Sequence, residues 1–476
     1  MRRISVFQKS LFVLILVASS TKVSAADGLP ALDKTAANKI SFRKDVWPIV
    51  KRHCWGCHSG MDAKGGLNMD SVTTMLKGGD SGGMFEPGKP DDSLLVEMIT
   101  GDEPAMPQKQ PPLSMAKINI LRGWILAGAK DDSKPGDTQP TVKIPRTYKF
   151  APAINSLSIS PDGKLLAAAC RSEVVVMNVD GDPAPRRLPT ECDLLTHVEF
   201  SADGKLLVAI GGSPSRYGEV RFFNPADGKL VAARRVGHDT LFRGSFAPDS
   251  KAVATGGSDG AVHIVPVDPK AKVRSFSLHS DWVLDVAYTP DGKMLITGGR
   301  DNATKVCSVE TGRLLRTIDM SSERITAVDS TAEFAFSSGK ARTLNGFEYK
   351  IALQGIEVTG SGNGSRPVSR RNQYVKGLET QPGEVLDIAV SGDRKLLAIA
   401  GAFGEVRVYN TADRKRVTLI GKIPAPIYSV TLNTDGSRLA IGSKSGQVLL
   451  YEVPSGKQLK TFAPVPVASQ DGVAAK

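Results

Sequence analysis

The sequence predicts a multidomain chain, in which a small all-α domain is followed by an all-β propeller whose repeats count as seven blades. Two observations carry this prediction. Residues 41–130 hold seven of the eleven methionines and have the pattern of helices joined by glycine-rich loops, whereas residues 150–465 alternate short β-branched runs with turn signals. Between the two lies a polar linker, residues 131–149, and the last residues, 466–476, form a tail.

The first element in the chain is a predicted secretory signal peptide, residues 1–25. Basic residues precede an apolar run at residues 11–18, and small residues ending at Ala25 fit the site that a signal peptidase cleaves. The apolar run is too short to span a bilayer, and nothing after it approaches the roughly 18 consecutive apolar residues of a membrane helix. We therefore expect a periplasmic or otherwise exported protein that does not span the membrane.

The stretch RHCWGCHSG, residues 52–60, places Cys54, Cys57 and His58 in a Cys-x-x-Cys-His pattern. A covalent heme needs two thiols that react with two vinyl groups on one edge of the porphyrin, and an imidazole beneath the iron. This spacing supplies both, with His58 as the proximal axial ligand. A zinc site, a redox dithiol and coincidence are the alternatives. A zinc site needs further ligands, yet the other cysteines lie in the second domain. A thioredoxin-like dithiol needs a strand-helix-strand setting, which this segment lacks.

A second axial ligand would come from a loop that folds back over the opposite face of the heme. Met106 is the candidate, because it stands in the proline-rich loop GDEPAMPQKQPPLS between two helical patterns. His53 adjoins Cys54 and can hardly reach the far face. The remaining methionines of this domain are weaker candidates through their position or because they fit a helical core: Met61, Met69, Met75, Met84, Met98 and Met115.

Two helices frame these candidates. The segment FRKDVWPIVKRHC predicts a short helix that ends where the cysteines begin. The segment SMAKINILRGWILAGA predicts a longer helix between an N-cap at Ser114 and a stop near Gly128. Trp124, in this second helix, is predicted to pack near the heme edge, with simple core filling as the alternative.

Together these segments resemble the planctomycete-type cytochrome c family over residues 41–130. The resemblance rests on SFRKDVWPIVKRHCWGCHSG, KGGLNMD, GGDSGGMFEPGKPDDSLLVEMI, AMPQKQPPLS and LRGWILAGA, in that order. It implies an all-α cytochrome c domain with one covalent heme c on the two cysteines, and with His58 and Met106 as iron ligands. The family usually has Met-Pro-Pro, whereas the third position here is Gln108.

The second domain repeats one motif along its length. Six copies occur, SPDGKLLA, SADGKLLV, APDSKAVA, TPDGKMLI, SGDRKLLA and NTDGSRLA. Their aspartates are 41, 46, 42, 102 and 42 residues apart, so the longest interval hides a degenerate unit. Seven units of about 42 residues, each with four short strands, predict a propeller, because one sheet alone has exposed edges and too little core.

The repeating unit resembles the WD-repeat family in GHDTLFRGSFAPDSKAVATGGSDGAVHIVPV and HSDWVLDVAYTPDGKMLITGGRDNATKVCSV. The resemblance implies two structural pairs, His238 with Asp259 and His279 with Asp301, each of which ties a loop to a turn. The signature tryptophan is absent, and its position is held by Met177, Phe223, Val265, Cys307, Tyr409 and Tyr451.

The three cysteines of the propeller have no predicted catalytic role. Cys307 is expected to be a buried apolar residue, because it stands at a tryptophan position. Cys170 and Cys192 are predicted to share one face of the propeller. In an oxidising compartment they could form a disulfide, and the sequence leaves this pairing open.

These patterns predict an exported c-type cytochrome that transfers single electrons, with the propeller as a docking or recognition module. No Gly-x-Ser-x-Gly stands in the strand-turn-helix setting of a serine nucleophile. The glycine-rich GSGNGS at residues 360–365 has the pattern of a loop and not of a phosphate-binding site. The sequence therefore favours electron transfer over catalysis. One alternative is a heme-containing oxidoreductase with a substrate site in the propeller, as in some nitrite reductases, for which only His197 is available as a ligand. The other is a heme-based redox sensor or scaffold.

The charge of the chain bears on its partners. The formal net charge is +12, and the predicted signal holds four basic residues and no acids, which leaves +8 on the mature chain. This excess favours an acidic redox partner protein, and a protein or an anionic polymer as the ligand of the propeller. No basic run interleaved with aromatics indicates nucleic acid. A slightly basic solvated surface without a specific ligand is the alternative.

Overall fold

The structure is a computed structural model that describes residues 29–59, 63–108, 110–132, 144–181, 184–237, 239–349, 353, 379–424 and 426–468. The predicted signal peptide, most of the predicted linker, the loop at 360–365, the end of the tail, Met61 and His238 lie outside these residues. The chain divides into two compact units, Met1–Trp47 with Gly82–Asp132, and Pro48–Ser81 with Ser133–Lys476. The predicted domain bounds stay predictions. Within the described ranges, no helix is long and apolar enough to cross a membrane.

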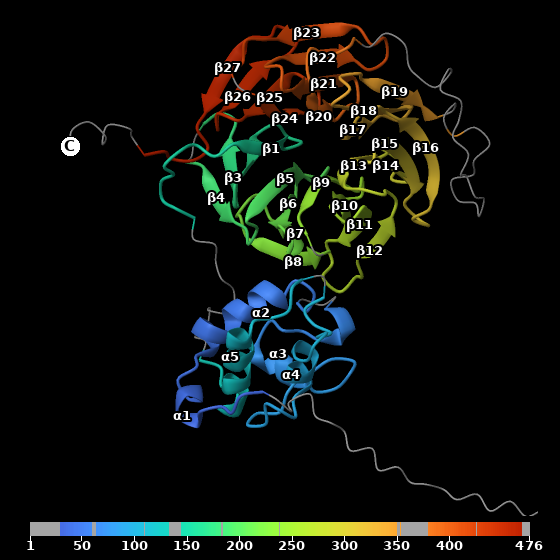
Figure 1. Ribbon diagram of the computed structural model, residues 1–476. Coiled ribbons are helices and arrows are strands. Elements are labelled where there is room, and N and C mark those ends of the chain that lie inside the picture. Colours follow the sequence, from blue (N-terminus) through green and yellow to red (C-terminus); the bar gives the residue numbers. More distant parts are fainter. Residues whose placement is uncertain are drawn as a thin grey trace, which may run out of the picture. The chain divides into compact units, whose positions relative to one another are not determined.

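The first compact unit contains short helices around one longer helix (Figure 1). Its elements are α1 (Lys34–Ala37), the π-helical turn η1 (Phe42–Val46), α4 (Leu94–Ile99) and α5 (Met115–Leu126). As predicted, α5 starts directly after Ser114, and Gly128 follows its end with a φ of 94°, which a residue with a Cβ rarely adopts. Its apolar side chains Ile118, Leu121 and Ile125 are buried, so α5 is the core helix of this unit.

Three further helices precede the propeller in the chain: α2 (Trp47–His53), η2 (Lys64–Gly66) and α3 (Val72–Lys77). The predicted end of α2 just before Cys54 is confirmed. Ile49 and Val50 on α2 are buried, as its periodicity indicated. The structure thus shows short helices in the N-terminal part of the chain, while their assembly into one all-α cytochrome domain stays a prediction.

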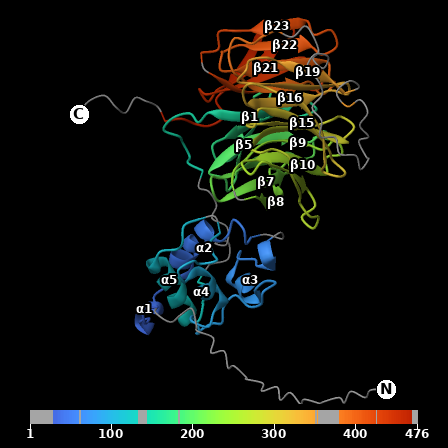
Figure 2. The same ribbon diagram turned by 45° about the vertical axis from the view of Figure 1, so that its right-hand side comes forward.

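The described residues between 154 and 462 form a propeller of seven sheets, which confirms the predicted blade number (Figures 1 and 2). Blade 1 contains β1 (Ile154–Ile159), β2 (Leu165–Cys170), β3 (Glu173–Asn178) and β4 (Arg186–Pro189). Blade 2 contains β5 (Leu194–Phe200), β6 (Leu207–Ser213), β7 (Tyr217–Phe223) and β8 (Leu230–Val236). Blade 3 contains β9 (Leu241–Phe246), β10 (Ala252–Gly257), β11 (Ala261–Pro266) and β12 (Arg274–Ser277).

The degenerate unit predicted from the long repeat interval is blade 5, in which the described residues form three strands. Blade 4 contains β13 (Val283–Tyr288), β14 (Met294–Gly299), β15 (Ala303–Ser308) and β16 (Leu314–Met320). Blade 5 contains β17 (Ile325–Ser330), β18 (Phe334–Gly339) and β19 (Asn345–Glu348). Blade 6 contains β20 (Val385–Val390), β21 (Leu396–Gly401), β22 (Val406–Asn410) and β23 (Arg416–Ile420). Blade 7 contains β24 (Ile427–Leu432), β25 (Arg438–Ser443), β26 (Val448–Glu452) and β27 (Gln458–Phe462).

The repeated Asp-Gly motif forms the turn between the first and second strands of a blade. In blade 1, Asp162 Oδ1 accepts hydrogen bonds from Ser160 Oγ at 2.6 Å and from the Lys164 backbone N–H at 3.1 Å. Gly163 within this turn has a φ of 71°. The same pair of bonds recurs at Asp203, Asp291 and Asp393. The motif is therefore turn chemistry, as the repeat predicted.

Side chains that face the centre of the ring bond each blade to the next. In every blade, a side chain of the first strand accepts a hydrogen bond from a backbone N–H of the next blade's first strand. In blade order, the donors and acceptors are Val198 N to Ser156, Phe246 N to Glu199, Tyr288 N to Ser245, Val328 N to Asp285, Val390 N to Asp329, Val430 N to Asp387 and Leu157 N to Ser429. The last of these closes the ring between blades 7 and 1.

The core of the propeller consists of apolar clusters between adjacent sheets. The six residues that replace the signature tryptophan are all buried, at 7% exposure or less. Cys307 among them is fully buried, as expected for an apolar filler. The predicted pair of His279 and Asp301 is confirmed, with Nδ1 and Oδ1 2.8 Å apart, and His279 Nε2 lies 2.7 Å from Thr297 Oγ1. Cys170 and Cys192 are buried and free, so the structure does not contain the disulfide between them.

Candidate functional site

Cys54, Cys57 and His58 lie together in one turn at the end of α2. The N–H of Cys54 donates to the Val50 carbonyl at 2.9 Å, which extends the helical hydrogen bonding by one residue. The N–H groups of Cys57 and His58 both donate to the Cys54 carbonyl at 3.1 Å. Both thiols are half-buried and outside any disulfide, and burial raises the pKa of the Cys54 thiol to about 12. One short hydrogen-bonded segment therefore carries two thiols and an imidazole.

The hydrogen bonds of His58 leave one ring nitrogen available for a metal. Nδ1 lies 3.0 Å from the Lys64 carbonyl oxygen, and since a carbonyl only accepts, Nδ1 carries the proton. Nε2 then keeps its lone pair, which is the form that ligates a metal. Burial also lowers the pKa of His58, which favours this neutral imidazole.

The loop after His58 is closed by further hydrogen bonds. The N–H of Lys64 donates to the Cys57 carbonyl at 2.8 Å, and the N–H of Met69 donates to the His58 carbonyl at 2.7 Å. Directly after this loop, Ser71 caps α3 and forms a reciprocal capping box with Thr74. These bonds hold the Lys64 carbonyl against the His58 ring, so the orientation of the imidazole is built into the local fold.

Met106 belongs to the first compact unit, in the loop after α4. Its side chain is half-buried, and its N–H donates to the Met98 carbonyl at 2.8 Å, which ties the loop to α4. The exposures of four other methionines are 2% for Met69, 0% for Met75, 3% for Met84 and 45% for Met115. Met106 therefore combines a loop position with a partly accessible thioether, and its role as ligand stays a prediction.

Trp124 is a core residue of the first unit. Its side chain is 1% exposed and its ring packs against Phe42 and Phe85, with centroids 5.3 Å and 5.2 Å away. Its Nε1 donates to the Lys130 carbonyl at 2.9 Å. These contacts are what simple core filling requires, and packing of Trp124 near a heme edge stays a prediction.

The donor chemistry of these residues fits a heme c. The turn supplies two thiols three residues apart, and His58 supplies a ring nitrogen with a free lone pair in the adjacent position. Met106 supplies a thioether in a loop. In the part of the chain that the structure describes, no three His, Cys, Asp or Glu side chains lie close enough together to hold a bare metal ion.

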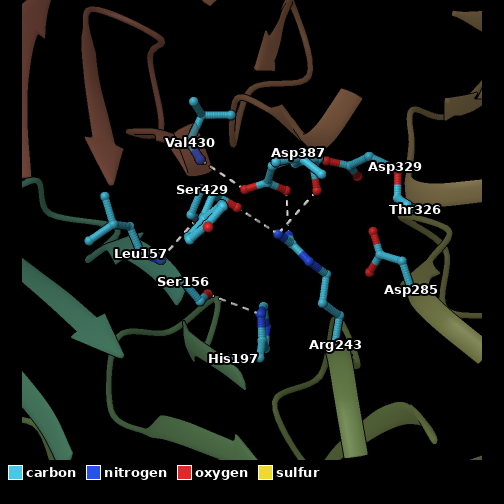
Figure 3. Close-up of polar contacts among 12 residues, drawn as sticks. Ser156, Leu157, His197, Arg243, Asp285, Thr326, Asp329, Asp387, Ser429 and Val430 are labelled. Carbon is cyan, nitrogen blue, oxygen red and sulfur yellow. Dashed lines mark hydrogen bonds and ion pairs between the residues drawn. The ribbon is translucent and has the colours of Figure 1, made fainter. Parts of the chain in front are cut away.

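A second candidate site, which the sequence-based predictions did not locate, is the channel of the propeller (Figure 3). First strands from all seven blades line a cavity of about 540 Å³. Arg243, on β9, reaches across it and forms an ion pair with Asp387 on β20. The same guanidinium donates to the Tyr428 carbonyl at 3.1 Å and more weakly to that of Leu386 at 3.4 Å. One side chain of blade 3 therefore bonds to blades 6 and 7.

The channel also holds one buried carboxyl, Asp285, one half-buried carboxyl, Asp329, and a histidine (Figure 3). Burial raises the pKa of Asp285 to about 7 and that of Asp329 to about 6. His197, the one ligand candidate that sequence analysis left in the propeller, has Nδ1 3.2 Å from Ser156 Oγ. A signal for this site was present in the sequence, because VLDVAY and VLDIAV place Asp285 and Asp387 at the same position of their first strands.

Two family models match this chain. The model described as Planctomycete cytochrome C matches residues 54–110, a stretch that contains the Cys-x-x-Cys-His turn and Met106. The model described as WD domain, G-beta repeat, matches residues 270–308, which span β12 to β15 and include His279 and Asp301. Among the curated proteins, no match to this chain was found.

Proposed function

We propose that this chain, in which a planctomycete-type cytochrome c domain precedes a WD-repeat β-propeller, is an exported c-type cytochrome that transfers single electrons. The observation that carries this proposal is the turn that holds Cys54, Cys57 and His58, with Nε2 of His58 left available. The predicted signal peptide supports export to the periplasm or beyond. The WD-repeat propeller suggests protein interaction, so we assign it the docking of a redox partner.

In this proposal each residue of the site has a defined role. Cys54 and Cys57 would hold one heme c through thioether bonds, and His58, held in orientation by the Lys64 carbonyl, would ligate its iron. Met106 would supply a second ligand to the iron. When bound, heme c would supply a one-electron iron couple, and ligation by methionine would raise its potential relative to two histidines. Covalent attachment keeps the cofactor on the protein throughout the exchange of electrons.

The attachment is tested on the full chain, produced in a host with heme-attachment machinery. The mass of the denatured protein is expected to exceed that of the polypeptide by one heme, because thioether bonds survive denaturation. A Cys54→Ala, Cys57→Ala double variant should lose this increment. A denatured wild type without bound heme would exclude the c-type cytochrome and return the motif to the zinc and dithiol alternatives.

The distal ligand is tested with Met106→Ala and the control Met98→Ala, which removes a half-buried methionine of α4. Met106→Ala should abolish the weak long-wavelength absorption band of a methionine-ligated ferric heme and lower the reduction potential. Met98→Ala should keep both the absorption band and the reduction potential of the wild type. An unchanged spectrum of Met106→Ala with heme still attached would remove Met106 from the site and leave the cytochrome assignment standing.

A further inference from the structure

The cavity in the propeller channel has the size of a ligand site. Its volume of about 540 Å³ lies within the range of roughly 300 to 1,000 Å³ that small-molecule pockets occupy. Its wall contains polar side chains from the first strands of several blades, where alternate residues face the centre of the ring. The cavity belongs to the propeller alone and involves none of the residues assigned to the heme.

Acidic groups outnumber permanent cations on the wall of this cavity. The four acids Glu199, Asp285, Asp329 and Asp387 face two arginines, Arg243 and Arg394. Arg243 is paired with Asp387, and Arg394 lies 3.6 Å from Asp329. Among the described residues, Glu199 and Asp285 form no ion pair with a lysine or an arginine. Glu199 and Asp285 are thus the two carboxylates of the wall without an ion pair to a permanent cation, although Arg243 attracts Asp285 from beyond ion-pair distance.

These two carboxylates are fixed in place by the blade contacts. Glu199 accepts a hydrogen bond from the N–H of Phe246 at 2.8 Å, and Asp285 accepts one from the N–H of Val328 at 2.8 Å. Asp285 is 5% exposed. Because a carboxylate has about four lone-pair sites, each retains acceptor capacity after these bonds. Burial of the Asp285 carboxylate is costly, and the attraction of Arg243 opposes this cost only in part, so a cation in the cavity would stabilise it. Glu199, whose side chain is 32% exposed, would gain less from the same cation.

His197 adds an acceptor to the same wall. Ser156 Oγ accepts a hydrogen bond from the N–H of Val198 at 3.2 Å. The hydroxyl of Ser156 donates its own proton to the Val198 carbonyl oxygen at 3.4 Å. Nδ1 of His197 then donates to Ser156 Oγ, 3.2 Å away, and Nε2 keeps its lone pair. Nε2 is buried without a hydrogen-bond donor, and the nearest charged atom is Glu199 Oε2 at 4.0 Å.

We propose that the channel of this propeller binds a small alkylammonium compound, with Glu199 and Asp285 as its anionic contacts. An ammonium group has three N–H donors and no acceptor, which complements carboxylates and an imidazole lone pair. The two carboxylates come from different blades, β5 and β13, so a ligand with two separated cations suits them. A metal ion would need converging ligands, and no three suitable side chains converge within the described residues.

Four probes of the full mature chain test this proposal by titration calorimetry at neutral pH. Three are four-carbon chains that differ in charge, 1,4-diaminobutane, 1,4-butanediol and succinate, and the fourth is calcium chloride. The diamine is expected to bind with a stoichiometry of one, and the other three should not bind. Binding of succinate, of calcium, or of the diol as tightly as the diamine would overturn the proposal, as would absence of binding by the diamine.

Three charge-neutralising variants locate the site. Glu199→Gln and Asp285→Asn keep a carbonyl acceptor for the blade contact and should each weaken diamine binding at least about ten-fold. Asp227→Asn removes the same charge in the turn between β7 and β8, outside the cavity, and should bind as wild type does. If one of the two cavity variants fails to fold, the other still tests whether the diamine binds in the cavity. Equal weakening by all three variants would indicate a nonspecific effect of net charge and overturn the assignment.

One further probe separates two sources of the ammonium group. A lysine capped at both backbone ends carries a single ammonium on a four-carbon stem, as a polypeptide would present it. Tighter binding of the free diamine supports a small metabolite as ligand, whereas tighter binding of the capped lysine supports a lysine side chain of a partner. The cationic chemistry of the site is upheld by either result.

Discussion

At the scale of single residues, the buried carboxyl of Asp285 links the stability of the propeller to pH. It is 5% exposed, and its carboxyl accepts hydrogen bonds from the backbone N–H groups of Val286 and Val328. Burial raises its pKa to about 7, opposed by Arg243 and reinforced by Asp387. Because an aspartate in an unfolded chain has a pKa of about 3.9, the folded protein binds more protons between these two values.

This difference predicts a pH dependence of stability. Where the folded protein binds more protons than the unfolded chain, the free energy of unfolding falls as pH rises. Between pH 5 and pH 7, Asp285 should contribute a decrease of at most about 1.4 kcal/mol per pH unit. Asp285→Asn should remove this slope in urea unfolding curves measured across that interval, whereas the exposed variant Asp413→Asn should keep it. Parallel pH profiles for wild type and Asp285→Asn would contradict the account.

At the scale of elements, the propeller closes without sharing a sheet between the two ends of the chain. Each sheet consists of strands that are consecutive in the sequence, including those of blades 1 and 7. The ring is joined by Ser429 Oγ, which accepts from the N–H of Leu157 at 3.0 Å. A parallel bridge between Tyr148 and Val467 adds a second connection. Closure therefore depends on a few hydrogen bonds and on the apolar packing between the two sheets.

Removing the closing hydrogen bond should destabilise the propeller measurably. Ser429 is 1% exposed, so Ser429→Ala leaves the N–H of Leu157 buried without its acceptor. Loss of this acceptor should lower the free energy of unfolding by about 1 to 3 kcal/mol. Ser455→Ala, which removes an exposed hydroxyl in the turn before β27, is the control and should change stability little. Urea unfolding of both variants measures the effect, and equal midpoints for Ser429→Ala and wild type would show that the bond is dispensable.

At the scale of the whole molecule, net charge bears on the proposed exchange of electrons. The chain carries +12, of which +8 remains after removal of the predicted signal peptide. Opposite charges accelerate the encounter of two proteins, and salt screens this attraction over roughly 8 Å at physiological ionic strength. An acidic redox protein is therefore the partner that the charge favours.

The rate of electron exchange with an acidic redox protein should fall as salt concentration rises. Stopped-flow measurement of the second-order rate constant between low and high ionic strength provides the test. A small uncharged reductant is the control, and its rate should stay nearly constant. A rate with the protein partner that rises with salt would indicate repulsion and would contradict an acidic partner.

The sequence alone determined features that depend on local spacing. Repeats of about 42 residues gave the seven blades and the place of the degenerate one, because each blade is built from one continuous segment. The Asp-Gly motif determined the turns, since their hydrogen bonds join residues two apart. The Cys-x-x-Cys-His spacing likewise determined that both thiols and the imidazole share one turn, in the segment that matches the Planctomycete cytochrome C model.

Only the tertiary structure decided the contacts between distant segments. Arg243 and Asp387 are separated by 144 residues, and no local pattern indicates that their side chains meet across the channel. Cys170 and Cys192 were candidates for a disulfide, yet they belong to different apolar clusters and remain free. Local spacing specifies turns and strands through hydrogen bonds between near neighbours. Closing the ring brings seven separate strands round one axis, and only that closure creates the channel and the charges that face each other within it.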